Sequence, residues 1–541
     1  MLLVTDITTA SENNVEAETY TGIYGLHKYW SKKPHDVVRR FITAYSHEGE
    51  IVLDPFCGSG VGIVEAIFTN RKAFGIDINP MATFITRQLL NNISPRDLQE
   101  AFDHLKEACQ GEINQKYILK REGKSLIATH FLLNKGNIEE IWYKNGRIKV
   151  IDTPQASDID LASSFSYEQI PFFYPRGKLF HNSRINAGPD LRVYQLFTPR
   201  NLSALATLRH HIEQIEPITA REMLEFCFTS SLGQASNMVF VVKRRGKMGG
   251  VSPECGKKEV GSWVIGFWMP PEHFEINVWH CFEHRFRKIL KTKRDQSETT
   301  WQVIETNSFE HFTTSNANLY LETSSAKKIL SQIPDNSIDY VITDPPHGDR
   351  IPYLELSQIW NEWLGFPVDF EGEIVVSDAK GRNKDLLTFE KALAEVFGQI
   401  SRVLKPDCHF SLIFNSLDDE IWLFLLNSLN TLNFKLAAVD YFRYSANSVV
   451  QDCRKRGLKC DFILTFRKAL NKNNPPITIC SAQDLAYIME SELKGAIGNQ
   501  NGDGKSVDFI NAIMANALLQ GKYCRISEIF KTLESFSAIP K

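Results

Sequence analysis

Two short runs that join an aspartate to proline constrain most strongly what this chain can fold into. Asp54-Pro55 follows the apolar run 51–53, and Asp344-Pro345-Pro346 follows the apolar run 340–343. Short apolar runs that end in such turns predict buried parallel strands. Parallel strands bring the residues that follow them to the carboxyl edge of a sheet, where α/β proteins bind ligands. We therefore expect an α/β core in which both runs contribute to one site.

The segment around the first run has the order strand, glycine turn, helix, strand and acid. Gly58 and Gly60 lack a Cβ atom, so backbone N–H groups can approach a ligand at the head of the next helix. Asp77 ends the second predicted strand, where a carboxylate binds ribose hydroxyls. Ile63 occupies the place of the third glycine in a dinucleotide motif. S-adenosylmethionine carries no phosphate and suits this shorter loop, although a glycine turn can also serve packing alone.

Other residues around this loop are candidates for binding the same cofactor. The segment 25–34 leads into a helix before the first strand and can place a cation near the methionine carboxylate. The alternative is a surface helix with solvated lysines. Together with Gly58, Gly60 and Asp77, the predicted cofactor-binding residues are Asp54, Phe56, Ile78, Lys32 and Pro34.

The second run predicts a site for the exocyclic amine of a base, which is a poor nucleophile because its lone pair is delocalised. Asp344 and the carbonyl of Pro345 can accept the two amine hydrogens and leave the lone pair directed at a methyl donor. Pro346 helps to fix the backbone. A planar His347 can stack on a base that is flipped out of the helix. The alternative is a strand-end turn without a function.

Several motifs together resemble the amino-methylating DNA methyltransferases of bacterial restriction–modification and related systems. The resemblance covers about residues 21–470 and rests on these motifs: DPFCGSG at 54–60, FGIDINP at 74–80, FTPRNL at 197–202, NVWHCFEHRF at 277–286, DPPHGDRIPYLELSQIWNEWLG at 344–365 and RVLKPD at 402–407. The motif order is similar to the alpha arrangement of that family, in which target recognition lies in a long insertion. It implies that Gly58, Gly60 and Asp77 bind S-adenosylmethionine and that residues 344–347 hold the target amine.

The resemblance also implies a target base, and the chain departs from the family pattern at one residue of the second run. An acidic first residue in the second run is commoner in the adenine-N6 enzymes than in the cytosine-N4 enzymes. The family usually has Tyr or Phe where this chain has His347, whose imidazole has a smaller face and titrates near neutrality. Tyr353 and Trp360 could add stacking, but we expect core positions for both. Many relatives carry a cysteine-rich zinc ribbon that this chain lacks, so no bound metal is expected.

The whole chain predicts a Rossmann-like class I methyltransferase sheet that is split by a long mixed α+β insertion. The expected domains are the cofactor half 21–99, the insertion 100–317, the catalytic half 318–470 and a small helical tail 480–541. Ten scattered cysteines without a C-x-x-C pair suggest reduced thiols in a bacterial or archaeal cytoplasm. No run of residues is apolar and long enough to cross a membrane.

Basic residues in the insertion are candidates for contact with double-stranded DNA. The net charge of −3 argues against binding by overall charge, but two local clusters can meet phosphates. The first lies at 243–258, and the second lies in a helix expected over 272–294. The alternative for each cluster is a solvated charged face. The predicted nucleic-acid-binding residues are Lys243, Arg244, Arg245, Lys247, Arg285 and Arg287.

Other functions remain open at this point. A cytosine-N4 enzyme or an RNA methylase of guanine N2 or adenine could use a similar second run. A non-catalytic nucleic-acid-binding subunit is a further alternative, which the retained Asp344 disfavours. A cognate restriction or defence subunit would be the expected protein partner.

Overall fold

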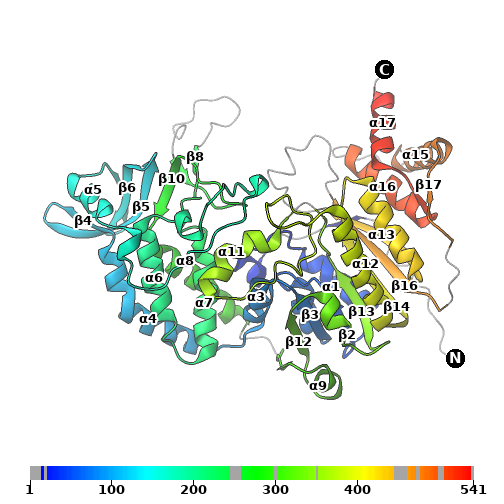
Figure 1. Cartoon of the computed structure of the whole chain (residues 1–541), viewed down its shortest axis with the longest axis horizontal. Helices are drawn as coiled ribbons and strands as arrows, with labels where there is room; N and C mark the ends of the chain where they lie inside the picture. The colour runs from blue at the N-terminus through cyan, green and yellow to red at the C-terminus, as the bar shows by residue number, and fades with distance from the viewer. Residues whose placement is uncertain are drawn as a thin grey trace.

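The computed structural model describes residues 14–16, 21–243, 258–296, 301–348, 351–443, 460–470, 475–497 and 505–537. Within these ranges the main sheet has nine strands in the order β1-β15-β16-β14-β13-β2-β3-β12-β11 (Figure 1). Its strands are β1 (Asn14–Glu16), β2 (Ile51–Asp54), β3 (Lys72–Asp77), β11 (Glu305–Thr306), β12 (Leu319–Thr323), β13 (Ile338–Thr343), β14 (Leu404–Phe414), β15 (Phe434–Arg443) and β16 (Cys460–Lys468).

The centre of this sheet is parallel, and its strand order reverses at β2. From β2 the chain passes through α2 (Val61–Phe68) to β3 on one side, while β13 pairs with β2 on the other side. Among the described strands of the sheet, β16 alone runs antiparallel to its neighbours, β14 and β15. Open α/β sheets bind ligands where the order reverses, at the carboxyl ends of the strands. The topology therefore places the site between β2, β3 and β13.

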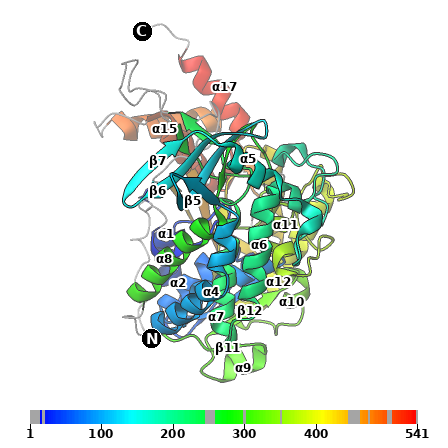
Figure 2. The same ribbon diagram turned by 90° about the vertical axis from the view of Figure 1, so that its left-hand side faces the viewer.

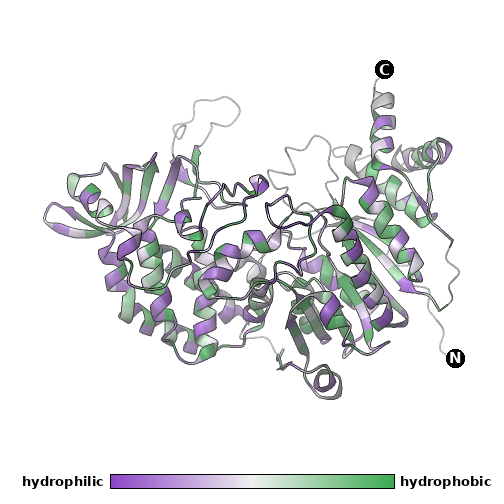
Figure 3. Ribbon diagram, viewed as in Figure 1, coloured by the Kyte–Doolittle hydropathy of each residue, from purple (hydrophilic) through white to green (hydrophobic). Residues whose placement is uncertain are grey.

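Helices cover both faces of the sheet, and this confirms the predicted α/β class. Alternate residues of β2 point to opposite faces: Val52 packs in one core and Leu53 in the other. The first core includes α1 (His35–Tyr45), α2 and α3 (Pro80–Leu90), and the second includes α10 (Ala326–Leu330), α12 (Leu386–Val403) and α13 (Asp419–Thr431). Figure 3 shows the central strands as largely hydrophobic, as strands covered on both faces require.

The insertion forms a second lobe of helices capped by a small antiparallel sheet (Figure 2). Its sheet contains β4 (Ile118–Arg121), β5 (Lys124–Asn134), β6 (Asn137–Asn145), β7 (Ile148–Asp152) and β10 (Glu272–Ile276). Its helices are α4 (Pro95–Gln115), α5 (Ala156–Ser163), α6 (Pro199–Ile212), α7 (Ile218–Leu232) and α8 (Val278–Gln296). The Phe102 and Phe286 rings stack at 3.7 Å between centroids and join α4 to α8. Helix α4 runs across residue 99, where the sequence predicts the boundary between the cofactor half and the insertion.

Shorter elements connect or flank the two lobes. Helix α11 (Tyr353–Leu364) follows the second aspartate–proline run and contacts both α3 of the sheet lobe and α7 of the insertion. The others are the 3₁₀ helices at Gly22–Gly25, Tyr167–Gln169, Ser183–Ile185 and Val193–Leu196, the strands β8 (Val241–Lys243) and β9 (Lys258–Val260), and helix α9 (Phe309–Thr314).

The C-terminal tail is helical and contains a disulfide that contradicts the expectation of reduced thiols throughout. It comprises α15 (Ala482–Ile497), α16 (Lys505–Leu519) and α17 (Ile526–Ser537), with β17 (Thr478–Ile479) beside β18 (Lys522–Tyr523). The parallel β17–β18 pair brings Cys480 and Cys524 together, with 4.9 Å between Cα atoms. Their separation of 44 residues hid this pairing in the sequence. No described helix is long and apolar enough to span a membrane.

Candidate functional site

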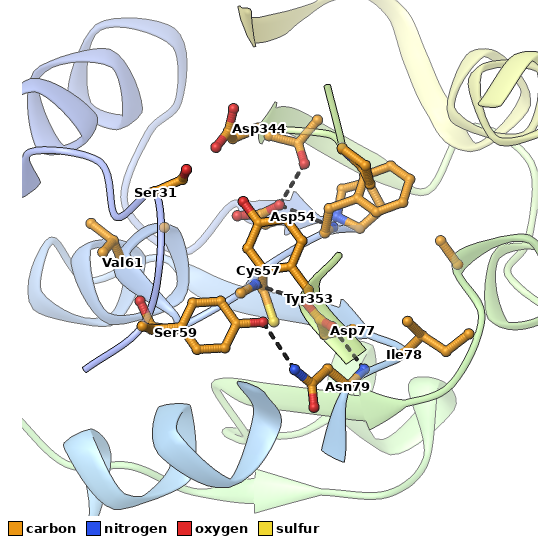
Figure 4. Close-up of a pocket in the computed structure, with 18 of the residues that line it drawn as sticks. Ser31, Asp54, Cys57, Ser59, Val61, Asp77, Ile78, Asn79, Asp344 and Tyr353 are labelled. Carbon is orange, nitrogen blue, oxygen red and sulfur yellow. Dashed lines mark hydrogen bonds between the residues drawn. The ribbon is translucent and has the colours of Figure 1, made fainter. Parts of the chain in front are cut away.

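Three aspartates meet at the carboxyl edge of the sheet. Asp54 ends β2, Asp77 ends β3, and Asp344 follows β13 directly. They line one cavity of about 1030 Å³ that is open to solvent (Figure 4). Because β2 pairs in parallel with both β3 and β13, the two aspartate–proline runs lie side by side, as the sequence predicts.

Asp77 is held by the glycine loop that follows β2. The backbone N–H of Gly58 donates to one carboxylate oxygen at 2.8 Å, and that of Asn79 donates to the other at 2.8 Å. Burial raises the pKa of Asp77 to about 6, although both hydrogen bonds act in the opposite direction. A carboxylate oxygen has two lone pairs, so each can also accept a ribose hydroxyl. Asp77 therefore keeps acceptor capacity at the cavity, which is what a ribose diol requires.

Asp54 ties the two runs to each other. Its Oδ1 accepts a hydrogen bond from the Thr343 hydroxyl at 2.6 Å and from the Phe56 N–H at 3.2 Å. Burial raises the pKa of Asp54 to about 7, and the two hydrogen bonds oppose this increase. The position of Asp54 therefore fixes the end of β13 against the glycine loop that follows β2.

The two loop glycines have different roles. Gly58 lines the cavity, with a φ of +50°. Gly60, with a φ of +81°, does not line the cavity, and a Cβ there would lie 2.6 Å from the methyl carbon of Thr86 on α3. The structure thus explains Gly60 by helix packing rather than by approach to a ligand. Pro34 also lies outside the lining and precedes α1, whereas Phe56 and Ile78 line the cavity.

The lysines before α1 point to different partners. Lys32 lines the cavity, but its ammonium donates to the carbonyls of Tyr24 at 2.8 Å and His27 at 2.6 Å. Lys33, which sequence reasoning did not select, bridges Asp344 at 3.0 Å and Asp461 at 2.8 Å. Its place directly before Pro34, one residue from a predicted ligand, was the only signal in the sequence.

Asp344 is oriented by cationic and imidazole partners. Its Oδ2 faces Lys33, and its Oδ1 lies 2.8 Å from the Nε2 atom of His347. The His347 ring also packs edge-on against Phe414, with 5.0 Å between centroids. Asp344 and Pro346 line the cavity, whereas Pro345 and His347 are not among its lining residues. The imidazole therefore supports the carboxylate instead of presenting its face to the cavity.

An aromatic pair supplies the ring faces in the cavity. Tyr29 and Tyr353 both line it and stack with 5.8 Å between centroids and 19° between planes. Tyr353 is thus a cavity residue, in contrast to the core position expected for it. Trp360 is buried, with 1% of its surface exposed, as expected of a core residue. The tyrosine faces together with Asp77 fit a purine nucleoside such as the adenosine part of S-adenosylmethionine.

The predicted DNA-contacting residues are dispersed. Lys243 pairs with Glu272 at 3.1 Å, and the exposed Arg287 pairs with Glu283 at 3.0 Å. Arg285 lines a second cavity between α8 and the segment before α1. Three further candidates lie outside the described residues: Arg244, Arg245 and Lys247.

Metal binding has no evident site in the described ranges. Among them, no group of three or more His, Cys, Asp or Glu side chains has the arrangement to hold an ion. The expectation that the protein binds no metal stays a prediction.

Comparisons with known proteins find similarity to DNA methylases. Residues 5–86 match the family model of a DNA methylase, N6_N4_Mtase. The chain is 33% identical over 113 residues to the type II methyltransferase M.HpaI of Haemophilus parainfluenzae, covering 20% of this chain and 34% of that protein. It is 47% identical over 49 residues to the DNA adenine methyltransferase YhdJ of Escherichia coli, covering 9% of this chain and 17% of that protein. The matched segments are thus about a third or less of these relatives.

Among solved structures, the chain is similar to a Thermus thermophilus protein described as a DNA modification methylase and solved with S-adenosyl-L-methionine. The identity is 12%, the TM-score is 0.17, and the match covers 40% of this chain and 95% of that one.

Proposed function

We propose that this chain, whose residues 5–86 match the N6/N4 DNA methylase family model, transfers a methyl group to the exocyclic amine of a base in double-stranded DNA. The observation that carries the proposal is the meeting of Asp77 and Asp344 in one cavity. Under this proposal the Asp77 carboxylate binds the cofactor ribose, and the Asp344 carboxylate binds the target amine in the same cavity. A methyl donor and a methyl acceptor can therefore bind side by side.

The cofactor of this family is S-adenosylmethionine, whose sulfonium supplies an electrophilic methyl group. Asp77 would accept the ribose hydroxyls, and the Tyr29–Tyr353 pair would contact the adenine ring. Asp54 and Phe56 complete the loop around it. These residues orient the donor, so that the reaction gains from proximity rather than from covalent catalysis.

Asp344 would orient the target amine. Each of its oxygens already has one partner, Lys33 or His347, and keeps a second lone pair for an N–H donor. The Pro345 carbonyl, which the sequence predicts as the second acceptor, follows it in the chain. Fixing both amine hydrogens in the plane of the base directs the nitrogen lone pair out of that plane, towards the methyl donor. The proton released by transfer leaves through Asp344 or solvent.

We infer adenine N6 as the target, since Asp begins the second run. Cytosine N4 is the alternative within the same family. A role in a restriction–modification or related defence system, with a cognate protein partner, accords with the type II methyltransferase among the relatives. Residues 54–59, 77–78 and 344–347 are the proposed site, with Gly60 as a packing residue behind the loop.

The test is methylation of mixed DNA with methyl-labelled cofactor, followed by nucleoside analysis. Wild-type protein should yield N6-methyladenine, and N4-methylcytosine would correct the target. Asp344→Ala should abolish transfer while calorimetry shows cofactor affinity within about twofold of wild type, because Asp344 orients the amine. The matched control is Asp160→Ala, which removes an exposed carboxylate from α5 of the insertion. An Asp344→Ala protein that methylates at the wild-type rate would falsify the assignment.

A further inference from the structure

A second cavity adjoins the first across a layer of tryptophans. Trp30 lines the first cavity, and it packs on Trp360 at 5.1 Å and on Trp263 at 5.8 Å between ring centroids. The latter two line the second cavity, which is about 640 Å³ and open to solvent. Its walls come from α7 and α8 of the insertion and from the segment 25–28 of the sheet lobe. Both lobes therefore build this cavity, directly behind the wall of the first.

The lining of the second cavity suits an anion. Lys28 and Arg285 contribute two cations, and the Lys28 ammonium also donates to the Trp263 carbonyl at 2.8 Å. Among the described residues, no carboxylate lines this cavity. Its other polar side chains are His27, Thr229, Ser230, Gln234 and Ser262. Hydroxyl, amide and cationic groups of this kind are the usual side-chain partners of phosphate oxygens.

The cations around this cavity repel one another. Burial, together with the charge of Arg285, lowers the pKa of Lys28 to about 8. Burial likewise lowers the pKa of Lys32 to about 7, with added repulsion from Lys288 and Lys28. Within the part of the chain that the structure describes, Arg285 forms no ion pair, whereas Arg287 on the same helix pairs with Glu283. Bringing like charges together costs stability, which a bound anion would restore.

We propose that this second cavity binds a backbone phosphate of the DNA, with Arg285 and Lys28 as the contacting cations. The inference rests on the function proposed above and adds a place for the substrate backbone. A base that is flipped into the first cavity carries its flanking phosphates with it, and the second cavity lies one tryptophan layer away. Inorganic phosphate or a free nucleotide shares the same chemistry and is the competing source of the anion.

The experiment measures binding of a fluorescent DNA duplex from 50 to 400 mM NaCl for the wild type and Arg285→Gln. Removal of one phosphate contact should reduce the slope of log K against log[NaCl] by about 0.9. The loss of affinity caused by Arg285→Gln should therefore be about sixfold larger at 50 mM than at 400 mM NaCl, because this slope change acts over about 0.9 of a decade in salt concentration. Lys291→Gln is the matched control: it removes one exposed cation from the same helix outside the cavity.

Each outcome decides between the alternatives. A loss of slope in Arg285→Gln and not in Lys291→Gln, with unchanged cofactor affinity, supports the proposal. Equal losses in both variants show a diffuse field and overturn it. Wild-type binding of inorganic phosphate that Arg285→Gln abolishes, with DNA binding unchanged, assigns a free anion and also overturns it. If wild-type protein methylates no DNA, the proposed function fails; if it methylates normally and Arg285→Gln keeps the full slope, only the phosphate site fails.

Discussion

The ionisation of Asp77 makes cofactor binding depend on pH. Burial raises the pKa of Asp77 to about 6 in the protein without cofactor. Ribose hydroxyls donate hydrogen bonds, which are stronger to a carboxylate than to a carboxylic acid. Cofactor binding therefore favours the ionised form: affinity is full above pH 6 and falls as the pH is lowered through it. The raised pKa places this change between pH 5 and 7, since an Asp with an ordinary pKa would stay ionised at pH 5.

The magnitude follows from the ionised fraction. With a pKa of about 6, Asp77 is about nine-tenths ionised at pH 7 and about one-tenth ionised at pH 5. If the ionised form alone binds at full strength, the apparent Kd rises about tenfold over this range, or about 1.4 kcal/mol. Isothermal titration of S-adenosylmethionine at half-unit steps of pH measures this change directly.

Two variants isolate the responsible carboxylate. Asp77→Asn should bind S-adenosylmethionine at pH 7 about as weakly as the wild type does at pH 5. The Kd of this variant should change by less than about twofold between pH 5 and pH 7. Asp54→Asn should retain the tenfold change, although burial raises the pKa of Asp54 to about 7. A wild-type Kd that is equal at pH 5 and pH 7, or a tenfold change that survives in Asp77→Asn, refutes the reasoning. Thermal melts of each variant exclude loss of the fold as the cause.

Two further perturbations test the positioning of the site. Lys33→Gln should lower kcat on the order of a hundredfold with cofactor affinity unchanged, because Asp344 loses the cation 3.0 Å away. Lys33→Arg should recover part of the activity. Normal turnover in Lys33→Gln would contradict the role of Lys33 in orienting Asp344. Gly60→Ala should cost about 3 kcal/mol in urea unfolding, because a Cβ in the left-handed backbone would lie 2.6 Å from the Thr86 methyl carbon. Gly111→Ala, in open space on α4, should instead stabilise by about 1 kcal/mol, and equal effects of the two would refute the clash.

The strands that carry the site were predictable because their signal is local. The runs at 51–53 and 340–343 are apolar and end at aspartate–proline turns, and the structure has β2 and β13 there. Where partners are distant, the same reasoning failed. The helix expected over 272–294 begins only at 278, and residues 272–276 form β10 because they pair with 130–134 of β5. Strand pairing over more than a hundred residues leaves no periodicity to detect.

The site shows the same division. The types of residue that the chemistry needs, such as Asp77 and Asp344, follow motif patterns within one strand–turn unit. The partners that orient them come from elsewhere: Lys33 reaches Asp344 only because α1 packs beside β13, and Asp461 joins them from β16. The stacking of Tyr29 on Tyr353 likewise joins residues more than three hundred positions apart.

Short-range patterns of burial and turn residues were enough to predict the α/β class and to place the two aspartate–proline runs at the edge of one sheet. Which side chains face the cavities was set by the folded arrangement. In that arrangement His347 lies within hydrogen-bond distance of Asp344, and Arg285 lines the second cavity together with Lys28. Residue types and strand ends are encoded within a few neighbouring positions, whereas the orientation of a side chain depends on packing between segments that are far apart in the chain.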